Sequence, residues 1–280
     1  MTHAPALDPA LDPLLDAAAA AIRGADALVV TAGAGMGVDS GLPDFRGNEG
    51  FWNAYPPYRA AGHSFIDLAN PRWFVDDPAL AWGFYGHRLA LYRRTQPHAG
   101  FAILADIGAR MADGVFVVTS NVDGQFQRAG FAADRLCEVH GAIEHFQCTK
   151  HETCGIWSAP LEELVLDEAL RARAPWPTCP TCGALARPNI LMFGDGAWVA
   201  DRTAQQERRF QQFIAGVGRV VVVEAGAGTA IPTIRRLGEQ LARQEGTLVR
   251  LNVREPEGPV GTIGIAAGAR VALVAIAARL

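Results

Sequence analysis

Short runs of apolar residues that end in glycine-rich turns dominate the hydrophobic pattern of this chain. Residues 27–31, 115–119 and 220–223 are almost entirely apolar and β-branched, which is typical of strands buried on both faces of a parallel sheet. Residues 247–253 show the same pattern less regularly. The pattern therefore predicts a set of parallel strands, at least two of which lead into tight turns.

Amphipathic segments alternate with these strands. Residues 12–24 begin with Asp-Pro, typical of an N-cap followed by proline in the first turn, and residues 233–244 place Leu237 and Leu241 on one face. Strands that alternate with helices predict an α/β fold with a doubly wound, mostly parallel Rossmann-like sheet. Ligands of such sheets bind beyond the carboxyl ends of the strands. Residues 270–280 carry too little pattern to choose between helix and strand.

Two stretches interrupt the alternation. Residues 48–100 are rich in aromatic residues and proline with irregular spacing, which favours a mostly helical insertion. Residues 141–190 hold four of the five cysteines and little strand periodicity, which favours a small inserted module. We therefore expect a sheet domain made of residues 1–47, 101–140 and 191–280, interrupted by these two segments.

Composition narrows the class of protein. Half of the 280 residues are hydrophobic and 19% are charged, so the chain can bury a large core and is neither a disordered tail nor a disulfide mini-protein. The net charge is −4 without a run of like charge, so we expect neither nucleic acid nor a membrane surface as partner. No signal peptide or membrane-spanning run is visible, which predicts a soluble, cytoplasmic protein.

The cysteine spacing predicts a metal site. Cys148 and Cys154 are separated by five residues, and Cys179 and Cys182 by two. Two close pairs joined by a loop suit a tetrahedral zinc ion, and four thiolates would make that site closed and structural. His145 and His151 lie close enough in the sequence to replace one thiolate. The remaining cysteine, Cys137, is expected in the core.

The turn Gly33-Ala34-Gly35 is of the kind that brings backbone amides close to a phosphate, and by itself it is equally typical of an ordinary tight turn. Together with residues 40–47, Ser-Gly-Leu-Pro-Asp-Phe-Arg-Gly, it resembles the signature of the sirtuins, NAD-dependent protein lysine deacylases. Residues 119–124 resemble the family's TQNIDG, residues 139–141 its catalytic HG, and residues 187–194 its RPxxxxFG. The resemblance covers most of residues 25–255, and this combination is far more specific than any single motif.

The resemblance implies a reaction in which cleavage of nicotinamide from NAD builds positive charge on the ribose C1′, where the acyl-lysine oxygen attacks. It implies that His140 is the general base on a ribose hydroxyl, while Asn121 and Asp123 hold the nicotinamide amide and the ribose. Polar residues that end a strand can also be simple caps. The implied cofactor-binding set is Gly33, Ala34, Gly35, Ser40, Asp44, Phe45, Arg46, Ser120, Asn121, Val122, Asp123, Gly226, Ala227, Gly228 and Asn252.

The resemblance also implies substrate-binding residues. The apolar segment Ile190, Leu191, Met192, Phe193 and Gly194 would pair with the substrate backbone as an added strand, or be an ordinary core strand. Tyr85 and Arg88, at helical spacing, resemble the pair with which one sirtuin class binds the carboxylate of succinyl-, malonyl- or glutaryl-lysine. An aromatic core residue beside a solvated arginine is the alternative.

Three departures from the family pattern concern NAD affinity. The serine of the family's GAGxS is Gly37, the glutamine of its TQN is Ser120, and its GTS is Gly226-Ala227-Gly228. Each removes a side-chain hydrogen bond worth about 0.5 to 1.5 kcal/mol. The sequence favours an NAD-dependent deacylase with structural zinc that acts on acylated lysine. The alternatives are an ADP-ribosyltransferase or NAD hydrolase, and a non-enzymatic NAD-binding adaptor.

Overall fold

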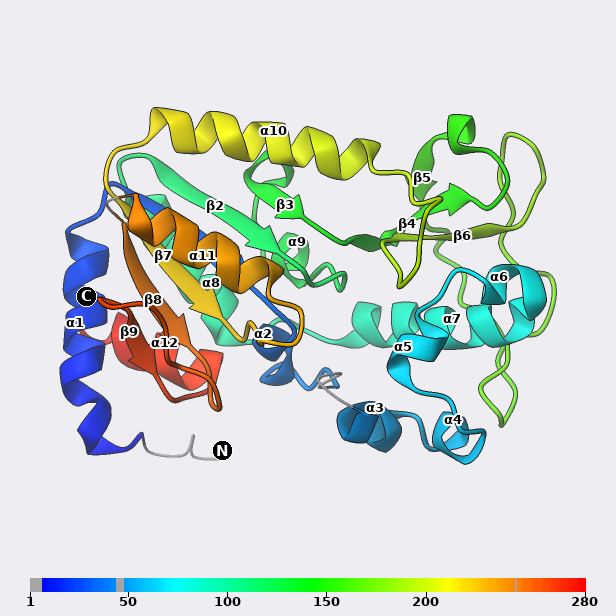
Figure 1. Cartoon of the computed structure of the whole chain (residues 1–280), viewed down its shortest axis with the longest axis horizontal. Coiled ribbons are helices and arrows are strands. Elements are labelled where there is room, and N and C mark those ends of the chain that lie inside the picture. The colour runs from blue at the N-terminus through cyan, green and yellow to red at the C-terminus, as the bar shows by residue number, and fades with distance from the viewer. Residues whose placement is uncertain (1–6, 44–47, 245) are drawn as a thin grey trace.

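The computed structural model describes residues 7–43, 48–244 and 246–280. Its larger sheet is six-stranded and parallel, in the order β3-β2-β1-β7-β8-β9, and its smaller sheet is antiparallel, in the order β5-β4-β6 (Figure 1). The strands are β1 (Ala27–Ala32), β2 (Gly114–Thr119), β3 (Leu136–Glu138), β4 (Gly141–Cys148), β5 (Ile156–Ser158), β6 (Ala186–Ile190), β7 (Val220–Ala225), β8 (Thr247–Leu251) and β9 (Ile263–Ile265).

Helices cover both faces of the larger sheet and make up much of the second lobe. Those of the sheet domain are α1 (Asp12–Arg23), α2 (Gly35–Val38), α8 (Ala99–Arg110), α9 (Gln125–Arg128), α10 (Asp201–Gly216), α11 (Thr233–Arg243) and α12 (Ala269–Ala277). Those between β1 and α8 are α3 (Asn48–Ala54), α4 (Pro56–Ala60), α5 (Phe65–Leu68), α6 (Trp73–Asp76) and α7 (Pro78–Arg94). Short 3-10 turns lie at Pro9–Leu11, Ala133–Arg135 and Glu152–Cys154.

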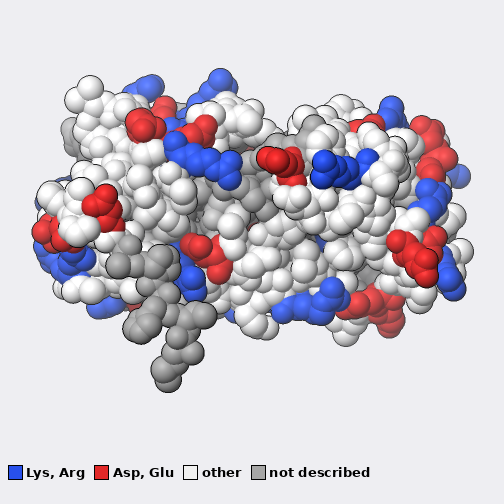
Figure 2. All heavy atoms as spheres, turned by 90° about the horizontal axis from the view of Figure 1, so that it is seen from below, with Lys and Arg blue, Asp and Glu red and all other residues white. Residues whose placement is uncertain are grey.

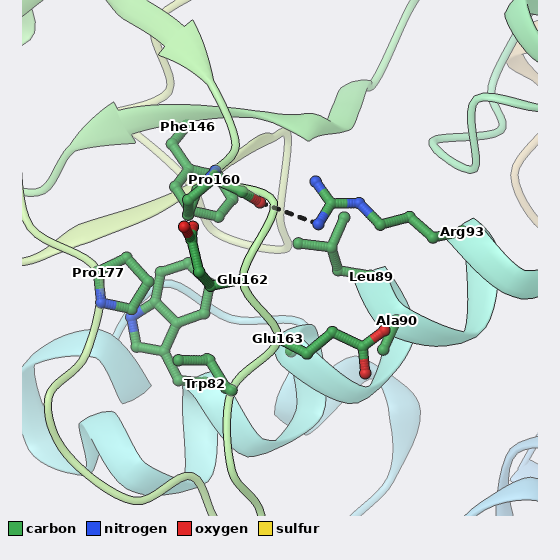
Figure 3. A pocket seen from close by; sticks show the side chains of 11 residues that line it. Trp82, Leu89, Ala90, Arg93, Phe146, Pro160, Glu162, Glu163 and Pro177 are labelled. Carbon is green, nitrogen blue, oxygen red and sulfur yellow. Dashed lines mark hydrogen bonds between the residues drawn. The ribbon is translucent and has the colours of Figure 1, made fainter.

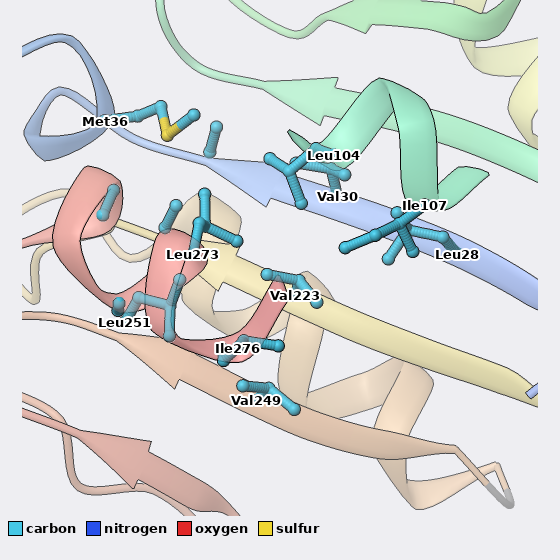
Figure 4. Packing of buried hydrophobic residues seen from close by; sticks show 14 of the residues in the cluster. Leu28, Val30, Met36, Leu104, Ile107, Val223, Val249, Leu251, Leu273 and Ile276 are labelled. Atoms are coloured by element: carbon cyan, nitrogen blue, oxygen red, sulfur yellow. The ribbon is translucent and has the colours of Figure 1, made fainter. Parts of the chain in front are cut away.

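Alternate residues of the central strands point to opposite faces of the large sheet. In β1, Leu28 and Val30 belong to the cluster that packs against α1, α8 and α12, whereas Val29 packs with Phe210 of α10 and Ile234 of α11. Figure 4 shows the first of these clusters, in which side chains from helices and strands meet on one face of the sheet. Both faces of the large sheet are therefore covered by helices and shielded from water. This explains why the strand sequences are continuously apolar and do not alternate between apolar and polar residues.

The predicted doubly wound fold is confirmed, with differences in detail. Residue 12 is not the N-cap: the structure begins α1 at Asp12, with Leu11 in the cap position, while Asp8 accepts a hydrogen bond from the Ala10 N–H at 2.9 Å in the preceding 3-10 turn. The ambiguous C-terminal segment is helical, as α12, and Asp39 accepts a hydrogen bond from the Arg270 N–H at 2.8 Å at its start. An acidic cap supplied by a distant segment leaves no local signal in the sequence.

The helical segment 48–100 and the cysteine-rich segment 141–190 share one hydrophobic cluster. Phe51 and Phe84 from the helices lie in the same cluster as Ile143 and Phe146 of β4 and Ala186 of β6. Helix α7 is buried nearly all round, since 11 of its 17 residues are buried. A helix without a solvent face shows no amphipathic stripe, which explains the irregular hydrophobic spacing of this segment.

A small cavity lies where the coil after β5 crosses α7. Trp82, Leu89, Phe146 and Leu164 are among its lining residues, and Arg93 donates a hydrogen bond to the Pro160 carbonyl at 2.9 Å across its rim (Figure 3). Its volume of about 10 Å³ holds at most one water molecule. The cavity is therefore a packing defect between coil and helix and is too small for a substrate.

Candidate functional site

The carboxyl ends of four parallel strands bring the predicted site residues to one edge of the large sheet. Gly33 follows β1, Ser120 follows β2, Gly226 follows β7 and Asn252 follows β8. The strand order reverses between β1 and β7, because the chain leaves β1 toward β2 on one side and returns to β7 on the other. Ligands of open α/β sheets bind at such a reversal. The two glycine turns lie on either side of it.

These two turns contact each other directly. The Gly35 N–H donates to the Gly226 carbonyl and the Gly33 N–H to the Ala225 carbonyl, both at 3.0 Å. A Cβ on Gly33 would lie 2.8 Å from the Ala227 Cα, and one on Gly226, whose φ is +64°, would lie 2.3 Å from the Gly35 carbonyl carbon. Glycine is required here first by the close approach of two backbones, and only then by any ligand.

Asn121 and Asp123 lie beside the first turn. The Asn121 side-chain amide donates to the Gly33 carbonyl at 2.9 Å, and its N–H donates to the Thr119 hydroxyl at 3.0 Å. Asp123 is buried, and its carboxylate accepts the Gln125 N–H at 2.9 Å. Burial raises the pKa of Asp123 to about 6, although this hydrogen bond and the nearby Arg128 oppose the shift. The carboxyl group is thus poised to gain or lose a proton near neutrality.

His140 lies on the connection between the two sheets, two residues after the end of β3 and directly before β4. Burial lowers its pKa below 6.5, against the opposing effect of a hydrogen bond with the Ser120 backbone. Its carbonyl accepts the Leu191 N–H at 3.0 Å, and a Cβ on Gly141 would lie 2.0 Å from the Asn189 carbonyl oxygen. The backbone around the imidazole is therefore fixed from both sides, and burial favours the neutral form of the ring.

Ser40 is already engaged by protein partners. Its hydroxyl lies 3.0 Å from the side-chain oxygen of Gln125 and accepts the His98 N–H at 3.0 Å. Gln125 is fully buried and belongs to none of the motifs in the sequence. The feature of the sequence that could have pointed to Gln125 is its position two residues after Asp123. The predicted residues Asp44, Phe45 and Arg46 lie outside the described residues.

Asn252 holds two loops together. Its side-chain amide donates to the Ala227 carbonyl at 2.8 Å, and its side-chain oxygen accepts the N–H groups of Arg254 at 3.0 Å and Glu255 at 3.1 Å. The residue is 2% exposed. These hydrogen bonds hold residues 226–228, which follow β7, against residues 252–255, which follow β8.

Tyr85 and Arg88 lie on α7 within an aromatic cluster. The Arg88 guanidinium is buried, stacks 5.1 Å from the Phe84 ring centroid, and donates to the Tyr92 hydroxyl at 2.7 and 3.1 Å. The buried Tyr85 hydroxyl has no hydrogen-bond partner in the described part of the chain. The electrostatic effect of Arg88 reaches Asp123, whose pKa it lowers. Of the predicted acyl-binding pair, Arg88 therefore lies close enough to Asp123 to influence its ionisation.

Residues 190–194 leave the small sheet and cross to the helical lobe. Ile190 ends β6, Leu191 is 39% exposed, and the Met192 N–H donates to Asp195 at 3.2 Å. The Phe193 N–H donates to the Ala69 carbonyl at 2.9 Å. Only the first of these residues lies in a strand. The segment that follows presents an exposed side chain beside the His140 backbone.

The four predicted cysteines form one cluster. The sulfur atoms of Cys148, Cys154, Cys179 and Cys182 all lie within 4.8 Å of one another, and those of Cys148 and Cys182 are 3.6 Å apart. Tetrahedral zinc with bonds of about 2.3 Å requires sulfur atoms about 3.8 Å apart, so this donor set fits. Lys150 and His151 direct their N–H groups at the Cys148 sulfur at 3.3 and 3.4 Å, and such contacts hold a ligand atom in its orientation.

Charge on the surface is mixed. On the face shown in Figure 2, basic and acidic side chains are interspersed. Within the described residues no helix is both long and apolar enough to cross a membrane.

A parallel sheet whose two glycine turns meet at the strand-order reversal, joined through a half-buried histidine to a lobe with four clustered cysteines, defines a dinucleotide-binding protein of Rossmann type whose second lobe carries a candidate zinc site. A model of the Sir2 family matches residues 33–224. The chain belongs to the Sir2 family.

Relatives extend over most of the chain. NAD-dependent protein deacylase 2 of Pyrobaculum aerophilum is 32% identical over 229 residues, covering 80% of this chain and 79% of the relative. The NAD-dependent protein deacylase of Pyrococcus abyssi is 32% identical over 226 residues, covering 80% of both chains. A solved Sir2 homologue with NAD matches in fold at a TM-score of 0.70 and 22% identity, over 99% of this chain and 95% of the other.

Proposed function

We propose that this protein is an NAD-dependent protein lysine deacylase that transfers the acyl group of an acylated lysine to ADP-ribose, releasing nicotinamide and the free lysine. The observation that carries this proposal is the similarity to NAD-dependent protein deacylases over 80% of the chain. The convergence of the predicted residues at the strand-order reversal supports it. Four cysteines suited to zinc favour a reducing compartment, so we place the reaction in the cytoplasm.

The dinucleotide would occupy the strand ends. The turns at residues 33–35 and 226–228 would face its phosphates, and Asn252 would lie on the adenosine side. Asn121 and Asp123 would lie on the nicotinamide side, where Asp123 is ionised above pH 6. The acyl-lysine peptide would lie along residues 190–194. The four thiolates would hold a zinc ion that stabilises the second lobe and takes no part in the chemistry.

His140 would take the proton from a ribose hydroxyl and return it later in the reaction. Burial lowers the pKa of His140 and so favours the neutral imidazole, the form that can accept that proton. The fixed backbone on both sides of the ring limits the reorganisation required for proton transfer.

The test is incubation with NAD and acetyl-, propionyl- or succinyl-lysine peptides, with peptide mass and nicotinamide release followed together. A deacylase releases nicotinamide and O-acyl-ADP-ribose in equal amounts. Equal nicotinamide release without peptide would instead indicate an NAD hydrolase. Modification of protein by ADP-ribose would indicate a transferase, and no reaction with retained NAD binding an adaptor.

His140→Ala tests the base. We expect a loss of turnover of at least about 100-fold, the usual scale for general-base catalysis, with ADP-ribose affinity largely kept. The wild-type rate should fall as pH drops below about 6, because protonation of Asp123 removes its ionised form; protonation of His140, whose pKa burial lowers, acts in the same direction. Retained turnover in the variant would exclude this base assignment.

We further propose that the preferred acyl chain carries a carboxylate. The Arg88 guanidinium and the Tyr85 hydroxyl lie buried on one helix face, and that hydroxyl has no partner among the described residues. A carboxylate oxygen would satisfy the hydroxyl while it interacts with the guanidinium. An acetyl group offers no such charge.

Arg88→Met tests this preference. We expect kcat/KM for the succinyl peptide to fall by about 10- to 100-fold, the scale of a charge-assisted hydrogen bond, and that for the acetyl peptide to change little. The control is Arg94→Met on the same helix, whose side chain is 58% exposed. An equal loss on both peptides would contradict selection of acidic acyl groups.

A further inference from the structure

A network of buried charged side chains lies beneath the loops that follow β7 and β8. Glu224 of β7 and Arg250 of β8 face each other in the sheet register, and neither side chain is exposed. The Arg250 Nε donates to Glu224 at 2.5 Å, and one terminal nitrogen donates to Glu239 of α11 at 3.0 Å. Burial of ions is costly unless each is paired, and here each has a partner.

A second arginine extends this network into the loops. Arg235 of α11 is 9% exposed, and its guanidinium donates to three carbonyl oxygens: those of Ala227 at 3.3 Å, Glu255 at 2.9 Å and Glu257 at 2.7 Å. Arg250 also donates to the Glu257 carbonyl. Ala227 belongs to the glycine turn after β7, and the two glutamates belong to the loop after β8. The planar guanidinium of Arg235 therefore connects both loops to α11.

These contacts fix the direction of a peptide group. The Ala227 carbonyl accepts from both Arg235 and Asn252, so it points into the protein. In a planar trans peptide the following N–H points the opposite way, so the Gly228 N–H is directed away from both side chains. Among the described residues this N–H has no backbone acceptor.

We propose that Arg235 is a positioning residue for the dinucleotide: it holds the carbonyls of both loops inward, so that the Gly228 N–H faces an oxygen of the ADP-ribose half. This inference rests on the proposed function. It explains how a turn with alanine and glycine in place of hydroxyl side chains can still bind a polar ligand, since the backbone supplies the donor.

The test is ADP-ribose binding by calorimetry for the wild type, Arg235→Met and Arg236→Met. Arg236 is the exposed next residue of α11, so its variant controls for loss of an arginine from this helix. We expect Arg235→Met to raise the Kd for ADP-ribose and the KM for NAD at least about tenfold, with kcat and the KM for acyl peptide within about threefold. Arg236→Met should stay within about twofold of the wild type in every constant.

Arg235→Lys covers the case in which Arg235→Met does not fold. Lysine keeps the charge but, as a compact ammonium group, cannot bridge three carbonyls, so its Kd should lie between those of the wild type and Arg235→Met. A Kd equal to the wild type in either folded variant, or a fall in kcat without a change in KM for NAD, would overturn the proposal. A wild type that binds ADP-ribose but does not deacylate peptides would overturn only the proposed function, because the binding comparison still decides the role of Arg235.

Discussion

Asp123 is the residue at which stability and the proposed activity conflict. It is 7% exposed, and burial raises its pKa from 3.8 to about 6. A raised pKa means that ionisation weakens the fold: the stabilising protonated form is fully populated below the unfolded pKa and is lost as pH rises through the folded pKa. At neutral pH the protein therefore holds a buried carboxylate at the expense of stability, as functional sites often do.

Asp123→Asn should separate the two properties. The amide keeps an oxygen for the Gln125 N–H but carries no charge, so above pH 6 we expect the variant to be more stable than the wild type, by up to about 3 kcal/mol. Turnover should fall at every pH. Urea unfolding between pH 5 and 8 measures the difference, which should shrink as pH falls below about 6. A difference in unfolding free energy between the variant and the wild type that grows toward low pH would contradict the raised pKa of Asp123.

Polar contacts of single residues were the least predictable part of the site. The sequence indicated the positions of Ser40 and Asn252 but not that protein groups already occupy their side chains. Gln125 and Arg235 carry no motif, and their importance arises from partners far away in the sequence, such as Ser40 and Glu255. Hydrogen bonds of this kind depend on tertiary packing that local sequence does not encode.

At the scale of elements, the two glycine turns act as one unit. Gly226 has a φ of +64° and faces the Gly35 backbone. Gly261 has a φ of +91°, and a Cβ added there would meet no atom of the described residues within 4 Å. Both glycines have a φ in the left-handed region, but only at Gly226 does the neighbouring backbone leave no room for a Cβ atom.

Gly226→Ala and Gly261→Ala form a matched pair. Gly261→Ala should cost about 1 to 2 kcal/mol, the strain of a left-handed alanine. Gly226→Ala should cost clearly more, because its Cβ would lie 2.3 Å from a backbone atom, and it should also weaken ADP-ribose binding. Denaturant unfolding and calorimetry measure both effects. Equal losses of stability would mean that the turns can move apart without cost.

Element type followed from the sequence where one face or both faces of an element are apolar. Residues 27–31 and 220–223 were predicted as buried strands, and the structure places them in β1 and β7. Helix α11, with Leu237 and Leu241 on one side, was predicted within one residue of its end. Helix α7 gave no periodic signal, because it is surrounded by protein.

At the scale of the whole molecule, the second lobe depends on contacts between segments far apart in the chain. Its cluster joins helices from residues 48–94 to strands from residues 141–190, and the cysteine cluster ties the turn after β4 to the turn before β6. A metal ion there would therefore stabilise the lobe against which His140 is held.

Cys179→Ser should lower zinc content and melting temperature together. The matched control is Cys137→Ser, a buried cysteine of the large sheet outside the cluster, which should lose stability but keep its zinc. Metal analysis and thermal unfolding, with and without a chelator, measure both. An unchanged zinc stoichiometry in Cys179→Ser would exclude the four-thiolate site.

The sequence by itself determined the α/β class, the parallel strands and the family resemblance, because apolar runs, glycine turns and cysteine pairs are local patterns with direct physical causes. Only the tertiary structure decided which loops touch, which carbonyls Arg235 holds, and how burial shifts the protonation of Asp123 and His140. Those properties depend on distance and desolvation, and both arise when segments remote in the chain pack together.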